Sequence, residues 1–287
     1  MDNCWIKGTA GEHVNNSINL RPLQHLRSGQ RNGSRWQHYL NEFHETHPGI
    51  TEDVLGQATF DERTPYEWLA QPVSHSGPTL DLACGSAPLF HAREWRNWVG
   101  LDRSWAELQR ASDRGAPTLV SGDATSLPFP PNSFQSVVCS MAIMLLQPLD
   151  EVLAEIYRVL QPDGTAAFTL PGSVPVTKRD LLFYAQLMWA LRRTHLAYPN
   201  DVKLVHLTRV LRAVGFERVS DERVRFSYHF ADSIAARRFV DSLYLPAVSA
   251  ARKAPAYALA QRYVGVEIGV PLRRIVLRRA ANSAPNY

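Results

Sequence analysis

The chain has 287 residues, 45% of them apolar, and a formal net charge of +4. This length suits one α/β domain with additions, and a chain of this size can bury a core without disulfides. Three cysteines could not form a disulfide framework. No stretch approaches the roughly 20 consecutive apolar residues that span a bilayer. The first residues show no secretory signal. We therefore expect a soluble cytoplasmic protein with no membrane partner, and we attribute the arginine-rich basic content to codon usage rather than to a nucleic-acid surface.

The N-terminal quarter reads as an arm followed by short helices. Residues 1–35 are polar and lack periodicity, so we expect a mobile arm there. Apolar residues then recur at helical spacing at Trp36, Tyr39, Leu40 and Phe43. A second helix is expected over 51–55. These segments place an N-terminal arm and lid helices over 1–63 and one α/β domain over 64–287.

The first strand and the turn after it carry the strongest signal. Thr64, followed by Pro65 and Glu67, predicts a capping box that starts a helix, and an apolar strand follows at 79–82. It runs into the small-residue turn 83–87, an arrangement with which a doubly wound sheet opens a nucleotide pocket. Because alanine tolerates positive φ poorly, the alanines at both ends of this turn are expected in ordinary φ/ψ regions.

Acidic residues end the next two strands. Asp102 follows the apolar run 98–101, where a carboxylate can accept hydrogen bonds from ribose hydroxyls. Ser104 and Glu107 predict a second capping box directly after it. Asp123 ends a third strand within 118–124, where its carboxylate can accept from an adenine amino group.

The remaining elements complete a sheet with two insertions. We expect a helix over 150–160, a turn over 161–164, a helix over 204–214, and helical insertions over about 173–203 and 231–265. The first insertion opens with Thr177 and Asp180 in a further capping box. Strands are expected over 134–140 and 165–170, and an antiparallel hairpin closes the fold over 218–230 and 269–279.

The order of these motifs resembles the class I S-adenosylmethionine-dependent methyltransferases, in particular their small-molecule branch of type 11. Gly122-Asp123-Ala124 ends the third strand as in that branch, and Arg158-Val159-Leu160-Gln161-Pro162-Asp163-Gly164 precedes the fifth. The resemblance covers 65–171 well and 204–279 loosely. It implies an α/β fold with a doubly wound, mostly parallel seven-stranded sheet, Rossmann-like, with helical lid additions.

The resemblance also implies a cofactor and its binding residues. The cofactor is S-adenosyl-L-methionine, which leaves as S-adenosyl-L-homocysteine. The residues expected to bind it are Tyr66, Asp81, Ala83, Cys84, Gly85, Ser86, Asp102, Arg103, Asp123, Ala124, Ser140 and Met141. A dinucleotide is disfavoured because Pro88 holds the position of the third glycine of the Rossmann fingerprint.

The chemistry expected is in-line displacement on the sulfonium methyl, for which positioning supplies much of the catalysis. A base is needed only for some acceptors, and the candidates are His38, Tyr39, His195 and His229. His91 and His206 are interpreted as structural. His44 and His47 have a spacing that could share a metal on a helix, but a solvated helix face is favoured, so no metal is expected.

The acceptor is expected to be a small apolar or aromatic molecule of the natural-product type, because the insertions are rich in aromatic residues and would cover the strand ends. The same insertions could instead patch the sheet edge or form a homodimer interface. Two other functions stay open. An RNA base methyltransferase would need a basic groove and strong salt dependence, and a non-catalytic or repurposed member would keep the fold and bind the cofactor without transferring its methyl group.

Overall fold

The computed structural model describes residues 6–7, 27–74, 76–173 and 176–280. Its sheet has eight strands in the order β1-β4-β3-β2-β5-β6-β8-β7. Neighbours from β1 to β6 are parallel, whereas β8 is antiparallel to β6 and to β7. The strands are β1 (Ile6–Lys7), β2 (Pro78–Leu82), β3 (Asn97–Asp102), β4 (Leu119–Ser121), β5 (Phe134–Ser140), β6 (Leu160–Pro171), β7 (Phe216–His229) and β8 (Glu267–Arg279).

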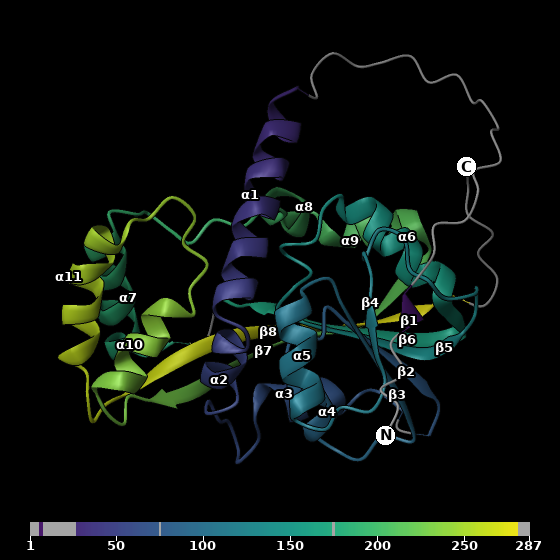
Figure 1. The fold of residues 1–287 in the computed structure, drawn as a ribbon, viewed down its shortest axis with the longest axis horizontal. Coiled ribbons are helices and arrows are strands. Elements are labelled where there is room, and N and C mark those ends of the chain that lie inside the picture. The colour runs from purple at the N-terminus through teal and green to yellow at the C-terminus, as the bar shows by residue number, and fades with distance from the viewer. Residues whose placement is uncertain (1–5, 8–26, 75, 174–175, 281–287) are drawn as a thin grey trace.

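Helices cover both faces of this sheet (Figure 1). Helices α3, α4 and α5 lie on one face, and α6, α8 and α9 lie on the other. Helices α7, α10 and α11 gather at the far end of β7 and β8, while α1 and α2 lie between this group and the main sheet. The helices are α1 (Arg27–Thr46), α2 (Ile50–Leu55), α3 (Pro65–Ala70), α4 (Pro88–His91), α5 (Trp105–Asp113), α6 (Leu149–Val159), α7 (Lys178–Leu191), α8 (Asp201–Val205), α9 (Leu207–Val214), α10 (Ser233–Asp241) and α11 (Ala250–Gln261).

The predicted α/β fold is confirmed, and the seven predicted strands are β2 to β8. The central strands β2 and β5 are apolar and buried along most of their length, as expected for parallel strands with helices on both faces. Strand order reverses direction on either side of β2, which creates the crevice at the carboxyl ends of β2 and β5 where such sheets bind ligands. None of the described helices is long and apolar enough to cross a membrane.

Two predicted capping boxes are present, and each fixes the start of a helix. At α3, Thr64 accepts from the backbone of Glu67, whose carboxylate accepts from the Thr64 backbone. At α7, Thr177 and Asp180 repeat the arrangement. The buried Asp180 carboxylate also accepts from the guanidinium of Arg225 at 2.7 and 3.0 Å and from the backbone of Gly269 at 2.7 Å. This one carboxylate therefore anchors the inserted helix to the terminal hairpin.

The third predicted box, at α5, differs from the prediction. Ser104 does accept from the backbone of Glu107, but the Glu107 carboxylate does not return to the helix start. It accepts instead from the backbone of Gly49 at 3.1 and 2.9 Å and contacts His44. A buried carboxylate finds more partners across this interface than at its own helix end, so Glu107 joins α5 to the loop between α1 and α2.

Elements differ most from the predictions in three places, while several strand ends differ by a few residues. Helix α1 begins at Arg27, inside the stretch predicted to be an arm, and β1 pairs with β4 from the same stretch. The other residues of the predicted arm, 1–5 and 8–26, lie outside the described residues. The helix predicted over 204–214 is divided at His206. The turn predicted over 161–164 is an irregularity within β6, where the pairing with β5 shifts register.

Candidate functional site

The turn between β2 and α4 is held in an unusual backbone conformation. Ala83, Gly85 and Ala87 have φ angles of 54°, 54° and 57°. The prediction of ordinary φ/ψ regions for the two alanines was therefore wrong. Left-handed alanine costs about 1–2 kcal/mol, and here the turn's own bonds offset it: Ala87 donates to the carbonyl of Cys84 at 2.9 Å, and Cys84 donates to that of Leu101 at 3.0 Å.

Asp102 joins this turn to the next one. Its Oδ2 accepts from the backbone of Gly85 at 2.9 Å, and its Oδ1 accepts from the backbone of Ser104 at 2.9 Å. Each carboxylate oxygen keeps further acceptor capacity. Asp102 therefore fixes the geometry of two strand ends and still presents its oxygens to the pocket that it lines.

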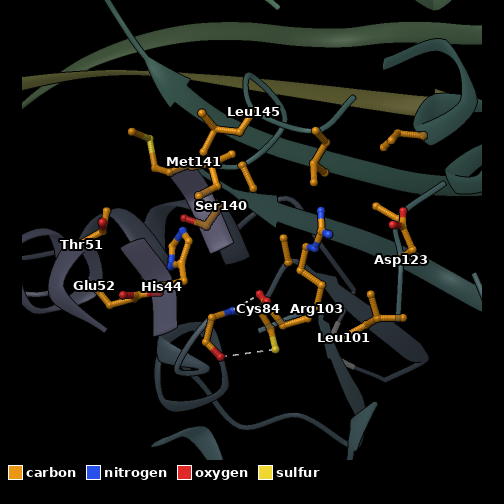
Figure 2. Close-up of a pocket in the computed structure, with 18 of the residues that line it drawn as sticks. His44, Thr51, Glu52, Cys84, Leu101, Arg103, Asp123, Ser140, Met141 and Leu145 are labelled. Atoms are coloured by element: carbon orange, nitrogen blue, oxygen red, sulfur yellow. Dashed lines mark hydrogen bonds between the residues drawn. The ribbon is translucent and has the colours of Figure 1, made fainter. Parts of the chain in front are cut away.

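A pocket opens at these strand ends (Figure 2). We call it the strand-end pocket. Glu52 and His44 lie on one side of it and Asp123 on the opposite side, with Met141 and Leu145 above. Its lining includes ten of the twelve residues predicted to bind the cofactor, namely Tyr66, Ala83, Cys84, Gly85, Asp102, Arg103, Asp123, Ala124, Ser140 and Met141.

The other two predicted cofactor residues, Asp81 and Ser86, are buried and do not line the pocket. Asp81 is buried within β2, and its Oδ2 has no hydrogen-bond partner. Burial, together with the charges of Asp102 and Glu52, holds the pKa of Asp81 well above its ordinary value. Ser86 is fully buried and accepts from Arg114 at 3.0 Å.

Glu52 brings an incompletely paired carboxylate into the strand-end pocket from α2. Its Oε2 is buried without a hydrogen-bond partner. Its Oε1 lies so close to Gly85 that a side chain there would collide with it at 2.1 Å. Burial and the nearby charge of Glu107 raise the pKa of Glu52 to about 7. A carboxylate in this position is suited to a cationic ligand group.

A second pocket adjoins the first, and we call it the apolar pocket. The two share Thr51, Leu55, Met141 and Tyr244. Its lining comes largely from the inserted helices and from the ends of β6 and β8. Among the described residues that line it, none carries a charge, and the polar groups are hydroxyls such as those of Tyr184 and Ser242. Its walls suit an uncharged, mostly apolar molecule.

Comparisons with known proteins agree with this arrangement. A methyltransferase domain family matches residues 80–168. A demethylmenaquinone methyltransferase of Streptomyces avermitilis is 39% identical over 154 residues, which cover 51% of this chain and 65% of that protein. Its counterpart in Thermobifida fusca is 30% identical over 172 residues, covering 51% of this chain and 72% of the relative. The chain belongs to the class I S-adenosylmethionine-dependent methyltransferases.

Solved members of this fold confirm the architecture. A methyltransferase from Bacillus halodurans has a TM-score of 0.51 at 17% identity, covering 75% of this chain and 99% of the other. The [4+2]-cyclase SpnF also has a TM-score of 0.51, at 21% identity, covering 89% of this chain and 96% of its own. At these identities the likeness shows the fold alone. The chain spans 65%, 53% and 48% of the length of three curated relatives.

The four residues predicted as bases do not line either pocket of this methyltransferase fold. His38, His195 and His229 are exposed. Tyr39 is partly buried, and its hydroxyl accepts from the backbone of Leu245 at 2.8 Å, which ties α1 to the segment after α10. A general-base role for these four finds no geometric support in the two pockets.

Three further titratable groups line the strand-end pocket and were not predicted to do so, namely His44, Glu52 and Tyr244. Glu52 lies on a short helix that was predicted without a functional motif, and Tyr244 lies in an insertion that also has no motif. His44 was predicted to lie on a solvated helix face, but its Nδ1 contacts Glu107 at 2.7 Å and its Nε2 lies 3.3 Å from the Tyr244 hydroxyl. Within the described part of the chain, no three His, Cys, Asp or Glu side chains are arranged to hold a metal. Such long-range pairings leave no signal in sequence spacing.

Proposed function

We propose that the protein transfers the methyl group of S-adenosylmethionine to a small, uncharged, apolar or aromatic acceptor. The observation that carries this proposal is the junction of two unlike pockets. One lies at the strand ends and is lined by carboxylates as well as apolar side chains. The other is apolar and has no charge in its described lining. The relatives matched over half of this chain are named as methyltransferases of demethylmenaquinone, and another, from Thermosynechococcus vestitus, as one of 2-phytyl-1,4-naphtoquinone.

The strand-end pocket would hold the cofactor group by group. Asp102 would accept from the ribose hydroxyls and Asp123 from the adenine amino group, with Leu101 and Ala124 as apolar walls. Glu52 would pair with the α-ammonium of the methionyl part, since its Oε2 lacks a partner. Ser140 and Met141 lie where β5 ends and face the same cavity.

The apolar pocket would hold the acceptor. When S-adenosylmethionine is bound, it supplies a methyl group on a positively charged sulfur that leaves as a neutral thioether. The protein's part is then to hold donor and acceptor in line and to exclude water. Met141, Leu55 and Tyr244 line both pockets and so occupy the place where the two ligands would meet.

Calorimetric titration with S-adenosylmethionine tests the cofactor half, and transfer of a labelled methyl group to a panel of naphthols and hydroquinones tests the acceptor half. Saturable binding followed by labelling is the expected result. No cofactor binding by folded protein would refute the proposal. Tight binding without transfer to any acceptor would favour a repurposed member, and steep loss of activity with salt would favour a nucleic-acid substrate.

A further inference from the structure

Three side chains form a hydrogen-bonded series that reaches the junction of the two pockets. The Tyr244 hydroxyl lies 3.3 Å from Nε2 of His44, and Nδ1 of His44 lies 2.7 Å from Oε1 of Glu107. The three residues come from the segment after α10, from α1 and from α5, so no local spacing explains the series. Figure 2 shows the His44 ring projecting into the strand-end pocket.

The inner end of the series is fixed in place. The Glu107 side chain is buried, and both of its oxygens accept from the backbone of Gly49 at 3.1 and 2.9 Å. A carboxylate held in this way orients the imidazole and stabilises its protonated form, as the acidic member of a catalytic triad does. The outer end, Tyr244, is the member that lines both pockets.

The surrounding charges favour movement of a proton inward along the series. Burial lowers the pKa of His44, but the hydrogen bond and charge of Glu107, with Asp102 and Glu52 nearby, outweigh it and raise that pKa. Burial and the charges of Glu52 and Glu107 hold the pKa of Tyr244 well above its ordinary value. Tyr244 therefore stays a neutral hydroxyl that can accept one proton only as it gives up its own.

We propose that Tyr244 and His44 ionise the hydroxyl of an aromatic acceptor held in the apolar pocket. The acceptor's O–H bond breaks, its proton passes to the Tyr244 oxygen, and the Tyr244 proton passes to Nε2 of His44. The electron pair stays on the acceptor, which becomes the nucleophile, and the imidazolium is paired with Glu107. This inference rests on the proposed function and specifies the acceptor as a phenol-like hydroxyl compound.

The test uses 1-naphthol as a probe and S-adenosylhomocysteine as the cofactor product, so that no turnover is needed. Absorbance distinguishes naphthol from its anion, and the pH at which bound naphthol ionises is measured on the protein saturated with S-adenosylhomocysteine. We expect this midpoint to lie at least about one pH unit below that of free naphthol. His44→Gln and Tyr244→Phe should bind the probe and lose the shift, whereas His47→Gln, at an exposed residue just after α1, should retain it.

Several results would overturn the inference. These results are failure of the parent protein to bind the probe, binding without a shift of the midpoint, or an equal shift in the parent and in both variants. Tyr244→Phe keeps the buried ring, so it remains informative if His44→Gln does not fold, as checked by thermal unfolding. Binding of S-adenosylhomocysteine is measured first on the same samples. Its failure would refute the proposed function, whereas intact binding with an unshifted probe would refute this inference alone.

Discussion

The two pockets that meet at Tyr244 differ in how they are built and in what their walls can bind. The strand-end pocket is formed by turns at the ends of parallel strands and holds the carboxylates of Glu52 and Asp102. The apolar pocket is formed largely by inserted helices, and its described lining carries no charge. Under the proposed function, affinity for a charged cosubstrate and selection of an uncharged acceptor would be properties of different parts of the chain. Substitutions in one pocket should therefore change the binding of one ligand without changing the binding of the other.

The largest expected effect is a loss of stability when the contact that anchors α7, a wall of the apolar pocket, is removed. Asp180→Ala removes the buried carboxylate that anchors α7 and leaves the guanidinium of Arg225 without it. Breaking such a pair costs about 3–5 kcal/mol of unfolding free energy, which chemical denaturation measures. The matched control is Asp150→Ala, because Asp150 pairs with Lys203 at the surface and its loss should cost about 1 kcal/mol or less. Equal losses in the two variants would contradict this role for Asp180.

The next largest expected effect is a loss of cofactor affinity in the strand-end pocket. Asp102→Ala removes an acceptor for two backbone amides and for the proposed ribose contact. Hydrogen bonds to charged groups contribute about 1.5–3 kcal/mol, so affinity for S-adenosylmethionine should fall roughly 10- to 100-fold by calorimetry. Asp113→Ala, at the other end of α5, should leave it unchanged. Retained affinity in Asp102→Ala would remove this residue from the cofactor site.

Leu243→Asp tests whether the apolar pocket works separately from its neighbour. Leu243 lines only the apolar one of the two pockets, and a carboxylate there would make the entry of an apolar ring unfavourable. Binding of 1-naphthol should fall at least about tenfold while affinity for S-adenosylmethionine stays constant. Leu243→Met, similar in volume, is the control. A parallel loss of both ligands would show that the pockets are not independent.

Glu52→Gln tests the counter-charge within the strand-end pocket. Loss of the ammonium partner should weaken S-adenosylmethionine about tenfold, a cost of about 1.4 kcal/mol. 5′-Methylthioadenosine lacks the amino-acid part, so its affinity should not change. The exposed Glu42→Gln on α1 serves as control. Equal weakening of both ligands would mean that Glu52 shapes the pocket rather than binding the ammonium.

The smallest effect is a pH dependence of cofactor affinity. Burial raises the pKa of Glu52 to about 7, so binding of a cation must release its proton below that pH. Affinity of the parent should therefore increase as pH rises through 7, and this slope should be smaller in Glu52→Gln. The stability of the unliganded protein should change with pH in the opposite direction. Because the pKa of Glu52 is higher in the folded state, ionising Glu52 lowers the free energy of unfolding as pH rises from about 4.5 to 7. Thermal unfolding of both proteins measures this.

The difference between strand ends and tertiary contacts also explains how much of the site the sequence could predict. Asp102 and Asp123 follow apolar runs at strand ends, and parallel strands place such ends together, so local pattern brings both residues to the pocket that they line. The seven strands and two capping boxes followed from local rules for the same reason. His44, Glu52 and Tyr244 meet only through tertiary packing, across as many as 200 residues of sequence, and local patterns carry no information about such contacts.

The alanine turn shows a different limit. The conformational preference of alanine predicts negative φ at Ala83 and Ala87, yet both residues adopt positive φ. The backbone hydrogen bonds around the turn outweigh this local preference. Local rules predict the outcome where one effect dominates, and they fail where several bonds act together on one residue.

The wall that the two pockets share has a thermodynamic consequence. Thr51, Leu55, Met141 and Tyr244 face both cavities, so any adjustment they make to a first ligand changes the site of the second. The factor by which cofactor alters acceptor affinity must then equal the factor by which acceptor alters cofactor affinity. Under the proposed function these four side chains would couple two binding equilibria, and the order in which the ligands arrive would not change the strength of that coupling.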